Sequence, residues 1–241
     1  MIELYHNDKS TCSQKVRLCL AEKSIAWLSR HINIPKEENL SPAYLALNPN
    51  GVVPTLVHDG TAIPESTVIC EYLDEVFPTE PRLSPIDAKA RATMRVWLRY
   101  IDEVPSMAIR VPTFQNVILP RYQKMSQAEF DAFANRNPLR KSFLRRMGRT
   151  GFSREDYELA IEQLHQALER MEGALSKGPW LVDDHYGIAD ICVVPVLQRL
   201  EDLGMAEMWQ TKRPRVASWY ERMRARPAYA IAFYPGSRLF D

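Results

Sequence analysis

The chain has 241 residues, of which 46% are hydrophobic, enough apolar material for one large domain or two modest ones. Thirty-one lysines and arginines balance 30 acids, so no global charge favours nucleic acid or an anionic membrane surface. The sequence has no long apolar run and no leader pattern, and its four scattered cysteines lack metal-ligand spacing. We therefore expect a cytoplasmic globular protein with free thiols, no metal site and no membrane or nucleic-acid partner.

The first 78 residues alternate between strand-like and helix-like segments. Proline cannot donate to a central ladder, so Pro54 within an apolar run is expected to mark a bend with a cis peptide bond. The order of the segments predicts an α/β domain over residues 1–78. The expected strands are 2–5, 31–34, 52–57 and 62–63, and the expected helices are 13–23, 43–47 and 65–76.

No strand pattern follows the proline-rich stretch 79–85, which is typical of a linker between domains. The clearest helical period covers 157–175, where apolar and aromatic residues repeat on one face. Another helix is expected from residue 188, and the last regular one over 215–224, before an irregular aromatic tail. We therefore expect an all-helical domain over about 86–241.

A cluster of nucleophilic side chains lies where the first strand gives way to the first helix. Ser10, Cys12 and Ser13 all stand within one turn of that junction. The first helical turn leaves backbone N–H groups unpaired and carries the positive end of the helix dipole, so it stabilises a sulfur anion. The sequence predicts a thiolate site here, whether the sulfur belongs to the chain or to a bound ligand.

Two further features would converge on this cluster in a thioredoxin-like domain. A cis Val53–Pro54 bond would offer the backbone N–H and C=O of Val53 to an extended peptide. The helix start at Ser66 suits a carboxylate, whereas the side chain of Glu65 suits an ammonium group. A small peptide with an α-amino acid at one end and a thiol in its middle fits all three features, and glutathione is that peptide.

Short motifs along the whole chain resemble those of one enzyme family. Ser10–Ser13, followed by Val16-Arg17, is similar to the serine and cysteine motif of Zeta-class glutathione transferases. That family has asparagine-proline, valine-proline and acid-serine signatures for glutathione, and an N-capping motif on a buried helix. The matching segments are Asn48-Pro49, Val53-Pro54, Glu65-Ser66 and Gly187–Asp190.

Two branches of this family look nearest, and they differ in substrate. The C-terminal segments 203–205, 213–214 and 219–226 resemble those of bacterial tetrachlorohydroquinone reductive dehalogenases. The runs 65–73 and 94–97, with the basic stretch before Gly151, look more like bacterial lignin β-aryl-ether-cleaving transferases. Both branches use glutathione, so the resemblance implies the co-substrate and leaves the electrophile open.

The resemblance implies a glutathione transferase fold, with a thioredoxin-like α/β domain at 1–78 and an all-α domain at 86–241. It also implies a homodimer, and a detoxification or aromatic-catabolism reaction in which glutathione is conjugated to, or substituted onto, an aromatic or halogenated electrophile. The glutathione-binding residues that it implies are Asn39, Val53, Pro54, Glu65 and Ser66.

Three side chains compete for the catalytic role. In the family pattern Ser10 donates a hydrogen bond to the glutathione sulfur, which favours the thiolate. Cys12 matches the cysteine with which reductive dehalogenases resolve a glutathione conjugate by thiol–disulfide exchange. Ser13 matches the serine of the ether-cleaving branch. The alternatives to conjugation are thus a glutathione-dependent reductase that uses Cys12 and a non-catalytic glutathione-fold binding module.

Two positions depart from the family pattern. Val52 stands where many members have glutamine before Val-Pro, which puts one contact in doubt. Gly187 replaces the usual serine or threonine cap of the buried helix, at a cost of only a few tenths of a kcal/mol. Asp190, three residues on, is expected to be structural and to bond back to the turn.

The electrophile is expected to lie between the nucleophile cluster and the helical domain. The segment 121–154 holds nine lysines and arginines against two acids, which is typical of a solvated insertion or of a basic rim for anionic ligands. The sequence does not choose between these. The residues expected to line the electrophile site are Met107, Arg110, Val111, Phe114 and Tyr234.

Overall fold

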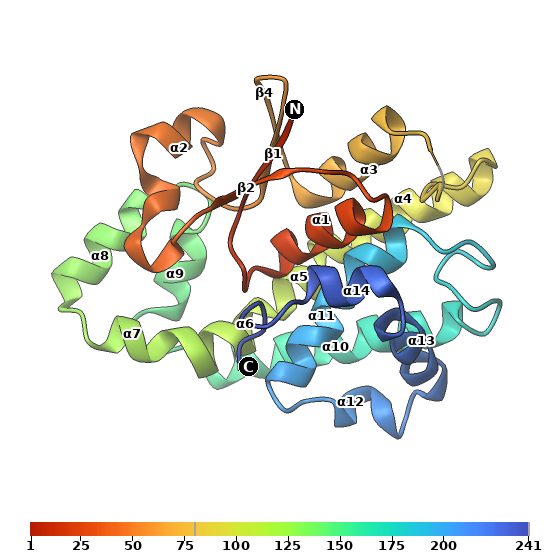
Figure 1. Cartoon of the computed structure of the whole chain (residues 1–241). Helices are drawn as coiled ribbons and strands as arrows, with labels where there is room; N and C mark the ends of the chain where they lie inside the picture. Colours follow the sequence, from red (N-terminus) through yellow and green to blue (C-terminus); the bar gives the residue numbers. More distant parts are fainter. Residues whose placement is uncertain (80, 241) are drawn as a thin grey trace.

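A four-stranded sheet in the order β2-β1-β3-β4 organises the N-terminal part of the chain (Figure 1). The computed structural model describes residues 1–79 and 81–240. The central strand β1 (Ile2–His6) pairs in parallel with β2 (Leu28–His31) and antiparallel with β3 (Thr55–His58). The edge strand β4 (Thr61–Pro64) pairs antiparallel with β3. Because β1 is central, its carboxyl end, where Ser10 follows, lies at the middle of one sheet edge.

Helix α1 connects the two parallel strands and packs with α3 on the sheet. Val16 and Leu20 of α1 and Leu73 of α3 are buried in one core with Leu4 and Leu56 of the sheet. This arrangement confirms the predicted thioredoxin-like domain. The helices of this part are α1 (Thr11–Glu22), α2 (Pro42–Leu47) and α3 (Ser66–Val76), with short 3₁₀ turns at Ile34–Lys36 and Glu38–Leu40.

The second strand lies three residues earlier than predicted. The sequence predicted a strand over 31–34, whereas β2 covers Leu28–His31. All four residues of β2 are exposed at the sheet edge, so the strand carries none of the apolar alternation on which the prediction depended. The alternating residues lie just beyond it, where Ile32 donates its N–H to the carbonyl of His6.

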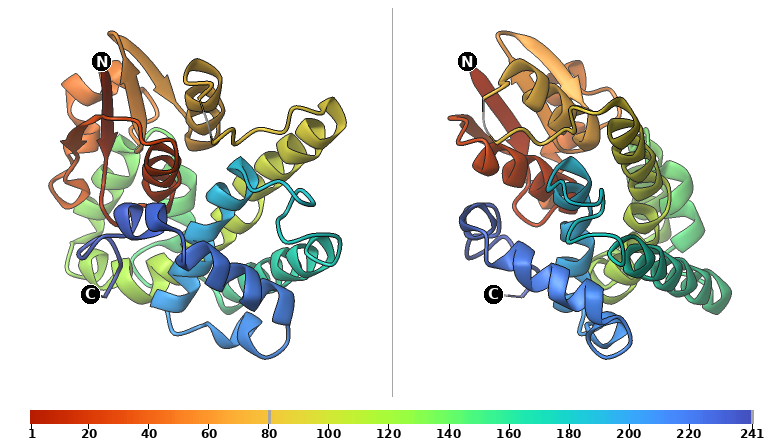
Figure 2. Two further views of the ribbon diagram at one scale, coloured as in Figure 1. Left: turned by 45° about the vertical axis from the view of Figure 1, so that its right-hand side comes forward. Right: turned by 90° about the vertical axis from the view of Figure 1, so that its right-hand side faces the viewer.

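The second part of the chain is helical, as predicted (Figure 2). Among its described residues the only β pairing is two isolated bridges near Trp180. The domain bounds 1–78 and 86–241 remain a prediction; residues 78 and 86 lie between α3 and α4, whereas residue 241 lies outside the described residues. The helices are α4 (Ala88–Glu103), α5 (Pro105–Ala108), α6 (Arg110–Thr113), α7 (Leu119–Gln123), α8 (Gln127–Arg136), α9 (Lys141–Met147), α10 (Arg154–Ala174), α11 (Ile188–Asp202), α12 (Glu207–Gln210), α13 (Pro214–Arg224) and α14 (Pro227–Ala232), with a π-helical turn at Phe114–Ile118 between α6 and α7.

The tail after α13 is more regular than predicted. Helix α14 forms within the segment that was expected to be irregular, and it packs against α1. Proline at its first position and the run of alanines favour the helix. Arg17 of α1 donates to the carbonyl of Ala232, so the tail is joined to the helix that begins at the nucleophile cluster.

Helix α11 is the centre of the helical part, and Asp190 fixes its start. The Asp190 carboxylate accepts hydrogen bonds from the N–H groups of Leu181 and Gly187 and from Nε1 of Trp219 at 2.7 Å. This confirms the structural role predicted for Asp190. A Cβ at Gly187 would lie 2.1 Å from the carbonyl oxygen of Leu83, which explains why glycine replaces the usual cap.

The helices between α6 and α10 have a small core of their own. Its residues are separate from the main core, which extends from the sheet through α10, α11 and α13. Figure 1 shows α7, α8 and α9 on the side of α2, away from α12 and α13. We call this the insertion core, and its buried members are Leu119, Tyr122, Phe130, Phe133, Ala134, Leu144 and Met147.

Over the described residues, no helix combines the length and the apolar character that crossing a bilayer requires.

Candidate active site

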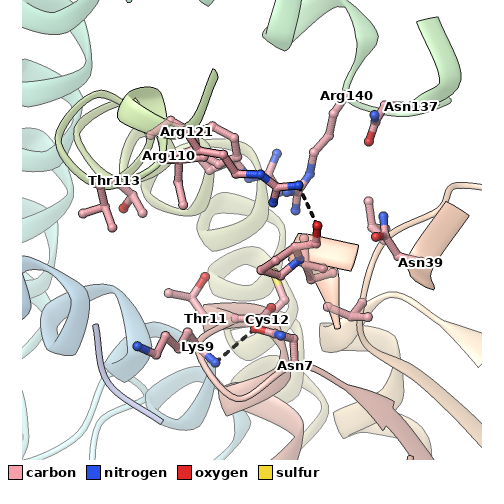
Figure 3. Close-up of a pocket in the computed structure, with 18 of the residues that line it drawn as sticks. Asn7, Lys9, Thr11, Cys12, Asn39, Arg110, Thr113, Arg121, Asn137 and Arg140 are labelled. Carbon is pink, nitrogen blue, oxygen red and sulfur yellow. Dashed lines mark hydrogen bonds between the residues drawn. The ribbon is translucent and has the colours of Figure 1, made fainter. Parts of the chain in front are cut away.

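A cavity of about 540 Å³ lies between the α/β part and the helices α6 to α9 (Figure 3). One side consists of the loop after β1, the first turn of α1 and the segments 33–35 and 51–53. The other side consists of residues from α6, the π-helical turn, α7, α8 and α9. Most of its exposed surface is apolar, and its polar groups gather at the loop before α1 and at a set of arginines. Such a pocket is typical of a small-molecule site.

The three predicted nucleophiles do not all face the cavity. Ser10 and Cys12 line it, whereas Ser13 is completely buried and does not. Ser10 is the N-cap of α1, and its Oγ accepts the N–H of Ser13 at 3.3 Å. The Ser13 hydroxyl accepts the N–H of Asn7. Because Ser10 uses a lone pair for the cap, its own O–H proton stays available for an anion in the cavity.

Arg17 fixes the loop that precedes Ser10. Its guanidinium is buried and donates to the carbonyls of Asn7 at 3.3 Å and Asp8 at 2.9 Å, besides that of Ala232. From the helical part, Arg199 of α11 donates to the carbonyl of Lys9. Both domains therefore hold the backbone that positions Ser10.

Cys12 lines the cavity from the first turn of α1, the helix that also carries the buried Lys15. The charge of Cys12 interacts with Lys15, Arg140 and Arg199. Burial opposes the charge of Lys15, but Cys12 and a 2.9 Å ion pair with Asp102 raise its pKa. Burial is the main cause that lowers the pKa of Arg199 to about 10.

The predicted glutathione residues fall into two groups. Asn39 and Val53 line the cavity, and the Val53–Pro54 bond is cis, as predicted. The Asn39 amide donates to the carbonyl of Gly51 at 2.8 Å and so fixes this segment. Pro54 is buried and does not line the cavity. Although Val52 lacks the amide of glutamine, its carbonyl is held by the side chains of Tyr44 and Asn48.

Glu65 and Ser66 lie outside the residues that line the cavity. Glu65 is exposed, with φ at 69°, and Ser66 begins α3. The next residue, Thr67, donates to Asp102 at 2.6 Å, and Asp102 also pairs with Lys15 of α1. The start of α3 is therefore bound through one carboxylate to the helix that carries Cys12.

On the helical side, the structure brings two of the five expected residues into the cavity. Arg110 and Phe114 line it, whereas Met107 is largely exposed and accepts a hydrogen bond from Arg110. Val111 packs against the main core. Tyr234 lies under the Arg17 guanidinium and donates to Asp8, which itself lines the cavity.

Sequence reasoning missed Arg140 and Arg199 as individual site residues. Arg140 belongs to the basic stretch 121–154, but its spacing does not distinguish it from the exposed arginines beside it. The sequence pattern around Arg199 could have indicated a role for it, because Arg199 is a charged residue at the end of a fully buried apolar run in α11. A lone arginine in such a run must reach a polar partner, and here that partner is the loop before Ser10.

Comparison with known proteins agrees with this geometry. Residues 9–76 match the family model of the glutathione S-transferase N-terminal domain, and residues 154–222 match that of the C-terminal domain. The chain is 35% identical to protein LigF of Sphingobium sp. strain SYK-6, over 98% of this chain and 95% of the relative. The chain belongs to the glutathione S-transferase family. This confirms the family predicted from the motifs.

Other relatives of this glutathione transferase fit the same branches. It is 25% identical to tetrachloro-p-hydroquinone reductive dehalogenase of Sphingobium chlorophenolicum, over 96% of this chain and 95% of that one. The crystal structure of β-etherase LigF superposes with a TM-score of 0.88, covering 96% of this chain and 98% of the other. The transferase therefore has the glutathione transferase fold, and glutathione is its co-substrate.

Proposed function

We propose that Ser10 donates a hydrogen bond to the sulfur of bound glutathione and so stabilises the thiolate that attacks the electrophile. The observation that carries this proposal is that Ser10 faces the cavity with its lone pair used by the N–H of Ser13 and its proton free. The start of α1 adds the helix dipole. In this proposal Asn39 and Val53 hold the peptide backbone of glutathione, and Glu65 and Ser66 hold its γ-glutamyl end.

The electrophile that we propose is an aromatic compound with a leaving group on carbon, such as an aryl ether or a halide. Support comes from the aromatic side chains Phe114, Tyr122 and Phe133 across the cavity from Ser10, and from the names of the relatives, which include a β-etherase and reductive dehalogenases. In the step proposed, the sulfur–carbon bond forms and the bond from carbon to the leaving group breaks. The leaving group departs with that electron pair.

Replacing Ser10 by alanine tests the proposal. Loss of a charge-assisted hydrogen bond to the thiolate is expected to lower kcat/KM roughly 10- to 100-fold and to raise the pKa of bound glutathione, read from thiolate absorbance. The same change removes a helix cap, so Ser41→Ala is the matched control, because Ser41 caps α2 in the same way, away from the cavity. An active Ser10→Ala enzyme together with an inactive Ser13→Ala enzyme would transfer the role to Ser13.

A second candidate makes Cys12 a working thiol. Its favouring observation is that Cys12 lines the cavity, whereas the other three cysteines are buried. The Cys12 thiolate would attack the sulfur of an aryl-glutathione conjugate. This forms a Cys12–glutathione disulfide and releases the arene, which takes a proton; a second glutathione thiolate then frees Cys12 as oxidised glutathione leaves.

Cys12→Ser separates this candidate from conjugation. If Cys12 works as a reductant, the variant accumulates the aryl-glutathione conjugate of a halogenated hydroquinone and forms no oxidised glutathione, while conjugation continues. Equal amounts of reduced arene from the variant and the original enzyme would exclude the reductase.

We also propose that the enzyme is a homodimer. The face that we assign to the contact carries Val68 of α3 and Val96 of α4, each about half exposed, beside the ion pair of Glu71 and Arg95. Light scattering should give twice the 27.8 kDa chain mass, and Val68→Glu should reduce it to one chain. A single-chain mass for the unchanged enzyme would contradict the proposal.

A further inference from the structure

The basic stretch 121–154 divides into two kinds of arginine. On its outer face, Arg136, Arg146 and Arg154 pair with Glu37, Asp156 and Glu158 at the surface. These pairs are exposed and neutralise one another, as expected of a solvated insertion. The outer arginines therefore do not account for a binding role of the stretch.

The inner arginines of the stretch, Arg121 and Arg140, face the cavity together with Arg110 of α6, and none of the three meets a carboxylate among the residues that the structure describes. Arg110, Arg121 and Arg140 come from α6, from α7 and from the residue before α9, and Figure 3 shows their guanidinium groups gathered at one end of the cavity. Arg121 donates to the carbonyl of Pro35 at 2.6 Å. Arg110 donates to the Met107 sulfur at 3.0 Å.

Arg140 is the least satisfied of the three. Its Nε is shielded from solvent and has no acceptor within the described part of the chain, and its guanidinium lies 5.9 Å from the centre of the Phe114 ring. Burial first, and the neighbouring charge of Arg110 second, lower the pKa of Arg140 to about 10. It therefore remains cationic at neutral pH, beside a like charge and with no carboxylate paired to it in the described part of the chain.

The cavity lining as described supplies one acid to balance these charges, and that acid is engaged elsewhere. Asp8 lies 3.1 Å from His31 and accepts the hydroxyl of Tyr234. The cavity surface is mostly apolar, and the Phe114 ring lies beside Arg140 at the cationic end. A ligand that fills this space needs an apolar body and an anionic group at its far end.

We infer that Arg110 and Arg140 bind a carboxylate carried by the electrophile, so that the preferred substrates are aromatic electrophiles with an acidic group remote from the reacting carbon. This rests on the proposed glutathione transfer. Arg121 is already held by Pro35 at the edge of the glutathione side, so it is not assigned to the electrophile. Since two guanidinium groups converge, a planar carboxylate can accept from both.

A matched pair of electrophiles tests the inference. The probes are 4-chloro-3,5-dinitrobenzoate and its uncharged carboxamide, and each kcat/KM is divided by the rate constant of its uncatalysed reaction with glutathione. The unchanged enzyme should prefer the carboxylate about tenfold or more. Arg140→Gln and, separately, Arg110→Gln should remove roughly 10- to 100-fold of activity on the carboxylate and less than threefold on the carboxamide. Arg140→Lys should retain an intermediate preference, because it keeps the charge without the fork.

The matched control is Arg145→Gln, on the same helix α9 but exposed and bonded to Asn135 outside the cavity; it should change neither rate. A carboxamide as good as the carboxylate for the unchanged enzyme would overturn the inference. So would an equal loss on both probes with a raised KM for glutathione, because the arginines would then bind the glycine carboxylate of glutathione.

Failure of the proposed function gives a different result. In that case neither probe is turned over, and calorimetric titration with 4-chloro-3,5-dinitrobenzoate becomes the test. Binding that Arg140→Gln abolishes would support the carboxylate site without transfer, whereas no binding, or equal binding of the carboxamide, would overturn it.

Discussion

The wall that the α/β domain gives to the cavity consists mainly of backbone and small polar side chains that satisfy one another, whereas the helical wall holds guanidinium groups without carboxylates. On the first wall, Ser10 caps a helix and Asn39 fixes Gly51. On the second, Arg110 and Arg140 face the cavity, where an apolar surface surrounds them. The polar groups of the first wall have their hydrogen-bond partners before a ligand binds. The guanidinium groups of the second wall gain a counter-ion only when an anion binds. A site for a constant co-substrate can thus have its hydrogen bonds formed in advance, whereas a site for a variable substrate keeps charged groups that the substrate must pair.

Weakening the support of the first wall should have the largest effect. Arg17→Met removes the guanidinium donor from the carbonyls of Asn7, Asp8 and Ala232 and leaves that of Asn7 with the N–H of Ser10, so we expect a loss of about 3 kcal/mol or more in the free energy of unfolding. Urea denaturation measures it, and Arg17→Lys should lose less. An unchanged midpoint would mean that the loop before Ser10 does not depend on this guanidinium.

The pH dependence of stability tests the support of α11, which joins the two walls through Arg199. Burial raises the pKa of Asp190 to about 6 from 3.8, so the folded chain binds this proton more readily than the unfolded chain between about pH 4 and 6. The contribution of Asp190 to stability is therefore highest below pH 4 and falls as pH rises through that window.

Asp190→Asn does not titrate and so isolates this contribution. The unfolding free energy of the variant minus that of the original chain should increase by roughly 1 to 3 kcal/mol as pH rises from 4 to 6. Urea denaturation at several pH values measures this difference. The contributions of the other titrating groups are the same in both chains and cancel. A constant difference across the window would show that the carboxylate is already ionised in the folded chain at pH 4.

A change at the glutathione end should act equally on every electrophile. Glu65→Gln weakens the proposed contact with the glutathione ammonium, so the KM for glutathione should rise about tenfold. The ratio of kcat/KM between two electrophiles should stay constant, because Glu65 lies outside the cavity lining. Kinetics with two electrophiles checks this. If Glu65→Gln altered that ratio, the two walls would not be independent.

The smallest effect is expected at the rim, where the walls meet. Arg136 of α8 pairs with Glu37 at 2.8 Å at the surface. Arg136→Gln should cost less than about 1 kcal/mol of unfolding free energy and leave the carboxylate preference unchanged. A larger loss, measured by urea denaturation, would mean that surface pairing controls how the helical wall is placed.

The same contrast explains what the sequence could reveal. The cis bond before Pro54 and the start of α3 at Ser66 depend on residues close together in the chain, so short motifs predict them. The first helix was expected from residue 13, whereas α1 begins at Thr11 with Ser10 as its cap. The glycine at 187 was noticed as a departure, but its cause is a carbonyl about a hundred residues away at Leu83, and no local pattern contains that contact.

The helical wall was predictable only as a composition. The excess of basic residues over 121–154 indicated either a solvated insertion or an anion-binding rim, and the structure contains both kinds of arginine. Arg136 and Arg140 are four residues apart, yet one pairs at the surface and the other faces the cavity. The fold of α8 and α9 over α2 decides this, and the fold is set by tertiary packing that a single sequence does not display.

The insertion core allows the helical wall to change independently of the rest of the molecule. Because its buried residues do not belong to the core around α11, repacking Phe130, Leu144 or Met147 would disturb the wall and leave the scaffold intact. Mutations that accumulate here would change what the enzyme accepts without the destabilisation that purges changes in the main core. A random mutant library should therefore be concentrated in this segment. Related transferases that share glutathione as co-substrate should differ here in the electrophiles that they accept.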